Sequence, residues 1–169
     1  ARRYRLHQQA QSIADTMRQA LITEATLTPK AGLVDAVHNG GHSDMNLALF
    51  LKSADAIAPY LGDCAATGMT FAGHPASPAL LAAIRPIGLA AEAAMRAATG
   101  GVNTHKGAIF AFGLTAAALG KRLAEAGRAM LADVQADVRA ICAELLAELH
   151  QSGDDSAGKR GSAQHGIRG

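Results

Sequence analysis

The sequence has no tryptophan and few aromatic or charged residues. Aromatic residues make up 4% of the 169 residues and charged residues 18%, and the formal net charge at pH 7 is only +2. A β-sandwich core normally uses more aromatic and β-branched side chains, so this composition favours closely packed helices. No lysine- and arginine-rich run interleaved with aromatic residues occurs, which argues against a nucleic-acid partner.

Cysteine and long apolar runs are also scarce. Cys64 and Cys142 are the two cysteines. They fit no metal-binding spacing, so we expect small buried thiols in a reduced chain, with a reactive thiol as the alternative. The longest apolar run, 108–120, is too short to cross a bilayer, and no basic-then-apolar leader precedes the first helix. We therefore expect a soluble, cytoplasmic protein without a membrane partner.

Hydrophobic residues make up 49% of the chain. One domain spanning 1–169 is expected, able to bury about 70% of its unfolded surface. Apolar residues recur at helical spacing, and no alternating run long enough for a strand occurs. The predicted fold class is all-α, a single-domain multi-helix bundle. Roughly seven helices are expected, over 4–24, 44–60, 61–72, 78–85, 87–99, 105–120 and 130–150.

Three sets of residues mark expected helix starts. Ser43 is expected to cap a helix that begins at Asp44, and Ser77 precedes a proline at the first helical position. Asn103 or Thr104 is expected to cap the helix that follows. Residues 151–169 are rich in Gly and Ser and are expected to form a loop or a mobile tail.

A first polar island lies around the segment 27–42, which contains Pro and three Gly residues and shows no sustained period. A connection of this length is usually functional or disordered, and the apolar pair Leu33 and Val34 argues for order. The chemistry-bearing residues of this island are Glu24, Lys30, Asp35, His38, His42 and Asp44.

A second island is the stretch 100–107, GGVNTHKG. Gly100 and Gly101 allow positive φ or a close approach to a ligand. The free N–H groups at a helix start beside Lys106 favour an anion. The alternative is an ordinary Gly-rich turn with a capping Asn. Glu92, Asn103, Thr104, His105 and Lys106 belong to this island.

The two islands together predict a nucleoside triphosphate site. Carboxylates suit Mg²⁺ and lysines suit phosphates, although neither island has Walker-type spacing. Structural alternatives remain for several residues. Glu92 pairs at i, i+4 with Arg96, which would be a surface ion pair, and Asp44 would be a first-turn acid. A transition metal bound by His38 and His42, also at i, i+4, is a further functional alternative, against which the intervening Asn39-Gly40-Gly41 argues because it disfavours a helix there.

Three motifs carry a resemblance to a known family. Residues 24–35 read EATLTPKAGLVD, residues 41–45 read GHSDM, and the stretch that starts at Glu92 continues into TGGVNTHKGAIF over 99–110. These motifs closely resemble the triphosphoribosyl-dephospho-CoA synthase family, with Ala31 where members usually have a second Pro. The resemblance spans nearly the whole chain. It implies that members continue well beyond the Gly-Ile-Arg-Gly motif at 166–169, so that the family's C-terminal part is missing here.

The resemblance implies transfer of the triphosphoribosyl unit of ATP to the 2′-hydroxyl of 3′-dephospho-CoA, with release of adenine. The product is the precursor of the prosthetic group of citrate lyase or malonate decarboxylase and would pass to an acyl-carrier-protein transferase. Three roles follow for residues of this sequence. The triphosphate would be bound by Lys30, Lys106 and Arg168, with Asn103, Thr104, Gly100 and Gly101. Mg²⁺ would be bound by Asp35, Asp44 or Glu92. The base would be Asp44 or Glu92, and the donor to adenine His105 or His42.

Two other functions remain open from the sequence. A helical metal-dependent phosphohydrolase would use the same His and Asp residues and would favour Mn²⁺ or Fe²⁺ over Mg²⁺. A non-catalytic helical partner protein would bind no nucleotide. A homodimer is compatible with the sequence, which decides neither the oligomeric state nor which carboxylate is base and which is metal ligand.

Overall fold

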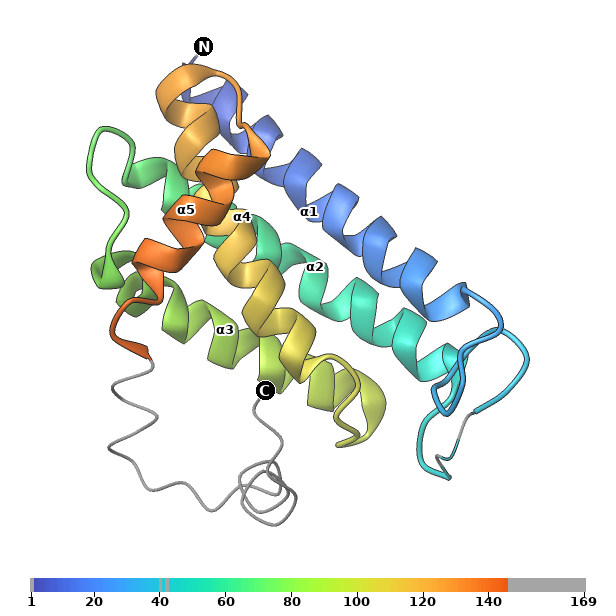
Figure 1. Cartoon of the computed structure of the whole chain (residues 1–169). Coiled ribbons are helices and arrows are strands. Elements are labelled where there is room, and N and C mark those ends of the chain that lie inside the picture. The colour runs from blue at the N-terminus through green and yellow to red at the C-terminus, as the bar shows by residue number, and fades with distance from the viewer. Residues whose placement is uncertain (1, 40, 42, 146–169) are drawn as a thin grey trace.

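The computed structural model describes residues 2–39, 41 and 43–145, and this part of the chain forms helices and loops with no strand. The predicted all-α class is therefore confirmed. The described residues contain five helices rather than the expected seven (Figure 1), namely α1 (Arg2–Thr26), α2 (Leu47–Thr70), α3 (Pro78–Thr99), α4 (Lys106–Ala126) and α5 (Leu131–Ile141).

α2 is the central helix of the bundle. It contacts α1, α3 and α4, whereas α5 packs on α4 and α3. Consecutive long helices run in opposite directions, so the end of α1, the start of α2, the end of α3 and the start of α4 lie at one end of the molecule (Figure 1). Both polar islands therefore fall at this end, which we call the loop end.

α2 and α4 approach each other so closely that only glycine fits at two positions. A Cβ built on Gly68 would lie 1.9 Å from the carbonyl oxygen of Ala117. One built on Gly120 would lie 2.1 Å from the carbonyl oxygen of Ala65. Each glycine thus faces an alanine of the other helix, and the two backbones touch without side chains between them. This contact fixes how α4 lies on α2.

The core is built from small and aliphatic side chains, as the low aromatic content predicts. Ile57 on α2 and Ile141 on α5 are fully buried, and Ala116, Ala117 and Ala118 of α4 have no exposed surface. By length and composition alone, α3 and α4 are each long and apolar enough to cross a membrane. The expectation drawn from the sequence considered only the run 108–120 and did not identify these two helices. The core helix of a soluble protein meets the same criterion, and Ala116, Ala117 and Ala118 of α4 are buried within the bundle.

Two of the expected helix boundaries, between 60 and 61 and between 85 and 87, do not exist. α2 continues through Pro59 and α3 through Pro86, so each is one helix where the sequence predicted two. Proline removes one N–H and leaves the carbonyl four residues earlier without its helical partner. Those carbonyls belong to Asp55 and Ala82, which are exposed residues, so water can replace the missing bond.

The start of α2 also differs from the prediction. The helix begins at Leu47, and the side chain of Asn46 accepts the Leu49 N–H at 3.0 Å, so Asn46 and not Ser43 is the cap. Ser77 and Pro78 do begin α3, although the Ser77 side chain makes no capping bond. The last helix was expected over 130–150. α5 ends at Ile141 and residues 142–144 form a turn, so the helix is shorter than expected, while residues 146–150 and the 151–169 tail lie outside the described residues.

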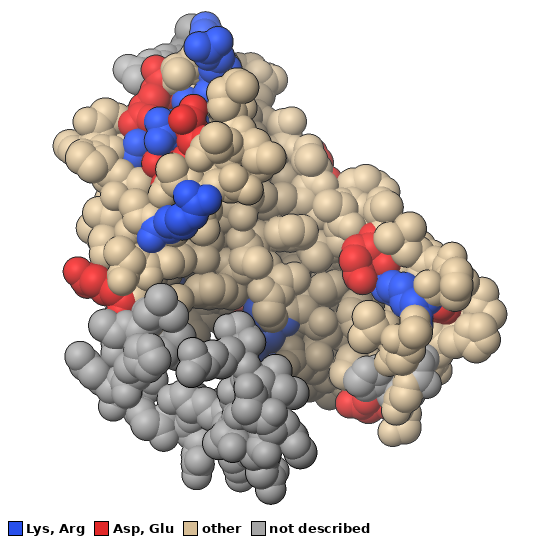
Figure 2. Space-filling model, in the orientation of Figure 1, with Lys and Arg blue, Asp and Glu red and all other residues tan. Residues whose placement is uncertain are grey.

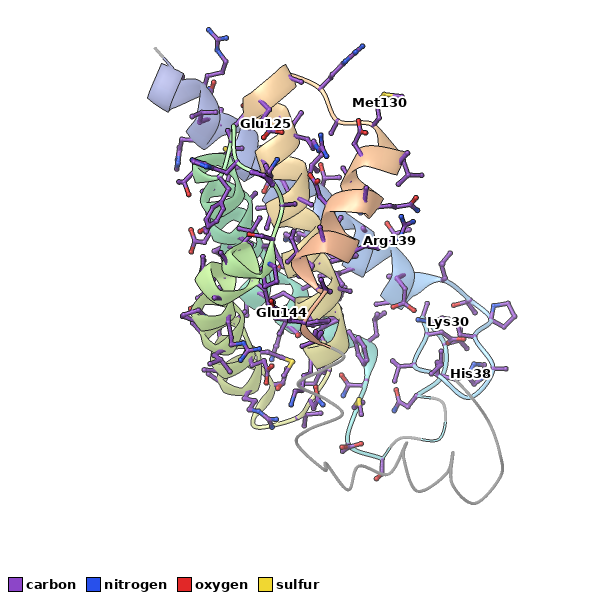
Figure 3. The ribbon with its side chains drawn as sticks, turned by 60° about the vertical axis from the view of Figure 1, so that its left-hand side comes forward. Lys30, His38, Glu125, Met130, Arg139 and Glu144 are labelled. Atoms are coloured by element: carbon purple, nitrogen blue, oxygen red, sulfur yellow. The ribbon has the colours of Figure 1, made fainter. Side chains whose placement is uncertain are left out.

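Ion pairs hold together the end of the bundle opposite the loop end. Arg122 of α4 makes two bonds of 2.6 Å to Asp137 of α5. The buried Lys121 ammonium donates to Glu125 at 2.6 Å, and the same carboxylate accepts the Gly73 N–H at 2.9 Å. Figure 3 shows Glu125 and Met130 at this end, far from Lys30 and His38. The polar groups of this end are thus committed to joining helices.

The contact between α2 and α4 predicts opposite effects for two Gly→Ala substitutions. Gly120→Ala is expected to destabilise the fold by about 3 kcal/mol, because the added methyl group overlaps the Ala65 backbone. Gly88→Ala, in the interior of α3 with no atom within 4 Å of the new Cβ, is expected to stabilise it by about 0.5–1 kcal/mol. Denaturant unfolding of both variants measures the difference, and equal midpoints would contradict the close approach.

Candidate functional site

The loop end gathers the polar residues of both sequence islands. Lys30 and His38 lie there in the loop between α1 and α2 (Figure 3). Charged side chains of both signs lie beside one another at this end of the surface (Figure 2). Glu24, at the end of α1, is close enough to His105, at the start of α4, to act on its pKa. Both islands therefore lie at the same end of the bundle, and the predicted joint site stays a prediction.

The buried Asp35 carboxylate holds the loop between α1 and α2 together by hydrogen bonds. Its carboxylate is 3% exposed and accepts three backbone N–H bonds, from Lys30 at 3.1 Å, Val37 at 2.8 Å and His38 at 2.7 Å. These bonds favour the ionised form and lower its pKa from 3.8 to about 2. The adjacent Val34 is 4% exposed, so the loop is ordered as Leu33 and Val34 suggested, with Val34 supplying the buried side chain. Both oxygens of Asp35 are occupied by the loop itself.

Lys30 reaches back to the end of α1. Its ammonium donates to the backbone carbonyl of Glu24 at 2.8 Å and to the Glu24 carboxylate at 3.0 Å. A cation at the C-terminal end of a helix is favoured by the helix dipole and by the unpaired carbonyls. The side chain remains 15% exposed, and an ammonium has three donors. One N–H is therefore left for an anion.

The glycine island forms the turn between α3 and α4. Gly100 and Gly101 adopt φ values of 67° and 95°, where a side chain would be strained. The Arg96 guanidinium donates to the Gly101 carbonyl at 3.3 Å, and Asn103 accepts the Lys106 N–H at 3.2 Å. The N-cap position of α4 is His105, whose side chain makes no capping bond, so neither Asn103 nor Thr104 is the N-cap residue. Asn103 still satisfies one N–H of the first turn, that of Lys106. The turn presents the first N–H groups of α4 next to Lys106.

His105 lies inside this end of the bundle, with two contacts to its ring and one to its backbone. The ring Nδ1 is 2.7 Å from Ser53 Oγ, and the Phe50 ring packs edge-on with centroids 5.0 Å apart. The His105 backbone N–H donates to Met95 Sδ at 3.1 Å. The residue is 5% exposed, and burial lowers its pKa below 6.5, an effect that Glu24 partly opposes. Burial therefore favours the neutral form of the ring.

The second ring nitrogen of His105 has no partner. Within the part of the chain that the structure describes, Nε2 is the one buried side-chain nitrogen or oxygen that makes no hydrogen bond. Leaving such a group unpaired costs about 1–3 kcal/mol. Unpaired buried polar atoms in native proteins call for a ligand, water or functional explanation. Nε2 is the strongest indication of a ligand contact in the structure.

Glu92 and Lys106 approach each other from α3 and α4. Glu92 Oε2 lies 3.8 Å from Lys106 Nζ, and the Glu92 side chain is 27% exposed. Glu92 also lines a cleft of about 130 Å³ between these helices, whose other walls are mainly apolar, with Ile109 and Phe110 from the first turns of α4. Arg96 donates to the Gly101 carbonyl. The ion pair that the structure gives Glu92 is thus the one with Lys106.

The carboxylates proposed as metal ligands are not gathered into one cluster. The described residues contain no group of three or more His, Cys, Asp or Glu side chains that could hold a metal ion. Asp35 fits a metal poorly, because both of its oxygens accept backbone N–H groups. Asp44 is exposed and Glu92 is partly exposed, so each has oxygen atoms available. Mg²⁺ that arrives with a triphosphate requires only one or two such carboxylates.

Some proposed site residues lie outside the described part of the chain, and one important residue was not proposed. His42 and Arg168 are outside it, so the adenine-donor role of His42, the phosphate role of Arg168 and metal binding by His38 with His42 stay predictions. The sequence reasoning missed Ser53. A signal existed, because this lone hydroxyl lies three residues after Phe50 and four before Ile57, on the buried face of α2.

Neither cysteine resembles a reactive thiol. Cys64 is 3% exposed, and burial raises its pKa to about 12. Burial also raises the pKa of Cys142, which is partly exposed. A thiolate is the nucleophilic form of cysteine, so both pKa shifts favour an unreactive thiol. The expectation of buried thiols is met fully at Cys64 and partly at Cys142.

The Asp35 bonds predict a specific loss of order in the loop. Because its folded pKa lies below 3.8, the stabilising contribution of Asp35 is present above that pH and is lost as the pH falls through about 2. Asp35→Asn is expected to remove it at neutral pH as well. Amide hydrogen exchange at Val37 and His38 should then accelerate about tenfold or more. Asp44→Asn, an exposed change in the same loop, should leave both amides protected; equal protection in the Asp35 variant would contradict this role.

Comparisons with known proteins place this site in a family. The sequence profile of the family described as ATP:dephospho-CoA triphosphoribosyl transferase matches residues 10–166. A Vibrio cholerae serotype O1 protein named probable 2-(5''-triphosphoribosyl)-3'-dephosphocoenzyme-A synthase is 45% identical over 154 residues, covering 89% of this chain and 49% of its own. The Pectobacterium atrosepticum protein named as this synthase is 42% identical over 168 residues, covering 98% and 56%.

A third relative, Protein CitXG of Haemophilus influenzae, is 47% identical over 145 residues, covering 86% of this chain and 30% of its own. The chain thus spans about half the length or less of these relatives. No solved structure matches. The profile match covers most of the chain and includes both polar islands, whose side chains meet at the loop end of the bundle. The chain belongs to the ATP:dephospho-CoA triphosphoribosyl transferase family.

Proposed function

We propose that this protein transfers the triphosphoribosyl unit of ATP to the 2′-hydroxyl of 3′-dephospho-CoA and releases adenine. The family description and the names of the relatives support this reaction. The single structural observation that carries it is the buried, unpaired Nε2 of His105, one residue before Lys106 and the open N-terminus of α4. A polar atom of this kind beside a cationic helix start suits a ligand that has both a base and phosphates.

The triphosphate is bound at the start of α4. Lys106 is the more available cation, with a side chain 56% exposed and only a 3.8 Å contact to Glu92. The N–H groups of the first helical turn add donors, and the helix dipole favours negative charge there. A Cβ at Gly107 would meet no protein atom within 4 Å, so the backbone is open to a ligand at this point. Lys30 supplies its remaining N–H from the other island.

Mg²⁺ accompanies the triphosphate. Glu92 and Asp44 are the carboxylates that fit it, whereas Asp35 is committed to the loop. When bound, the ion would neutralise part of the triphosphate charge. Before substrate binds, the Glu92 carboxylate can hold the neighbouring Lys106 ammonium in place.

The transfer breaks the bond between the ribose C1′ and adenine and forms a bond from the 2′-oxygen to C1′. Asp44 or Glu92 accepts the proton of the attacking hydroxyl, a role worth roughly 10²–10⁴-fold in rate. Positive charge develops on the ribose, as in glycoside cleavage. His105 provides a hydrogen bond to the departing adenine, which takes its proton from water, and the carboxylate returns the hydroxyl proton to the solvent, so that adenine is released as the neutral base. The product, a precursor of a protein prosthetic group, would pass to a second transferase.

The phosphohydrolase reading lacks a supporting observation. It needs several His and Asp ligands around a metal, and the described residues contain no such group. Family membership also favours transfer over phosphate release.

Product analysis tests the proposed reaction. The protein is incubated with ATP, Mg²⁺ and 3′-dephospho-CoA, and each component is omitted in turn, with a full-length relative as positive control. Adenine should appear only when both substrates are present. ADP, AMP or phosphate without adenine would contradict the transfer.

Lys106→Ala tests where the triphosphate binds. Loss of a charged hydrogen bond of about 1.5–3 kcal/mol predicts a decrease of roughly 10–100-fold in kcat/KM for ATP. Arg139→Ala, which removes a cation from the exposed face of α5, should leave kcat/KM unchanged. Gly107→Ala should raise the KM for ATP without lowering the melting temperature. Full turnover by the Lys106 variant would remove the phosphate role of this residue.

A further inference from the structure

A buried chain of three polar groups joins α2 to the turn before α4. Ser53 has no exposed surface, and its Oγ lies 2.7 Å from Thr104 Oγ1 and 2.7 Å from His105 Nδ1. A hydroxyl enclosed in an apolar core must find hydrogen-bond partners there. Both partners of Ser53 come from a segment about 50 residues further along the chain.

The hydrogen bonds along this chain favour one of the two neutral tautomers of His105. The Thr104 hydroxyl donates to Ser53 Oγ. The single proton of Ser53 is then available for Nδ1, which accepts it. A neutral imidazole has one N–H, so the hydrogen is on Nε2. Burial keeps the ring in this neutral form by lowering its pKa.

The result is a fixed donor with no acceptor. Phe50 restricts the ring from one side, the backbone of His105 is tied to Met95, and Nδ1 is tied to Ser53. Nε2 is buried and unpaired within the described residues. Since an unpaired buried donor costs free energy, an acceptor atom that a substrate brings to this point gains a strong hydrogen bond.

We propose that Ser53 is a positioning residue that fixes the Nε2–H tautomer of His105, so that His105 donates a hydrogen bond to a ring nitrogen of the departing adenine. His105 keeps its proton and does not act as the base that activates the attacking hydroxyl. The identity of the acceptor rests on the proposed transfer. The tautomer follows from the protein alone.

The tautomer is measured by ¹⁵N NMR of the histidine rings in the protein without substrate, and a His105→Gln spectrum identifies the His105 signals. The proton should be on Nε2 in the wild type and should distribute over both nitrogens in Ser53→Ala. Thr104→Val should keep it on Nε2, because Ser53 retains its own proton. A wild-type proton on Nδ1, or a Ser53→Ala spectrum identical to wild type, would overturn the positioning role. Only the wild-type measurement is needed if the variant does not fold.

Adenine release tests the donor role separately. Ser53→Ala is expected to lower kcat about tenfold and to change the KM for ATP less than twofold, because the ring loses its orientation but the phosphate contacts remain. His105→Gln, whose amide can still donate, should retain more kcat than His105→Leu. Equal loss in the two His105 variants would overturn the donor role. Absence of adenine from the wild type would refute the transfer and the adenine assignment, while the NMR result would still decide the role of Ser53.

Discussion

The contact between the α2 and α4 backbones is the constraint on which the site depends. Gly68 and Gly120 bring the two helices together until each glycine faces an alanine of its neighbour. Roughly three to four helical turns from this contact, Ser53 of α2 reaches the ring of His105 just before α4. A wider separation of α2 and α4 would place the Ser53 hydroxyl and the His105 imidazole beyond hydrogen-bond distance. The small residues of these helices therefore do more than fill a core, because they determine the distance across which the polar chain forms.

The two islands combine structural and chemical roles in neighbouring residues. Asp35 and Lys30 are bound to their own loop and to the end of α1, and Asn103 accepts the Lys106 N–H. These contacts hold the loop end in place without a ligand. Among the described residues of the two islands, the donors left for a ligand include the Lys106 ammonium, one N–H of Lys30, the amides of the first turn of α4 that follow Lys106, and Nε2 of His105. A preorganised site of this kind loses little conformational entropy when substrate binds.

The sequence predicted those features that depend on neighbouring residues. The all-α class, the position of α4 and the bond from the Lys106 N–H to Asn103 follow from composition, periodicity and residues three positions apart. The two extra helices were wrong because Pro59 and Pro86 lie on exposed helix faces, where the interruption is tolerated. Ser53 was missed because its partner His105 lies 52 positions away in the sequence, so no local pattern connects the two residues. Likewise, a lysine or aspartate in a glycine-rich loop looks like a ligand-binding residue until its partners a few residues away are known.

The central claim is that the nucleotide binds at the loop end, on the start of α4 and against His105. Titration of ¹⁵N-labelled protein with ATP and Mg²⁺ tests it most directly, without requiring turnover. We expect the largest shifts at the amides of Lys106 and Gly107 and at the Nε2–H of His105, with little change at Gly127 on the opposite end of α4. Shifts confined to that opposite end, or no shift at saturating ATP, would contradict the account.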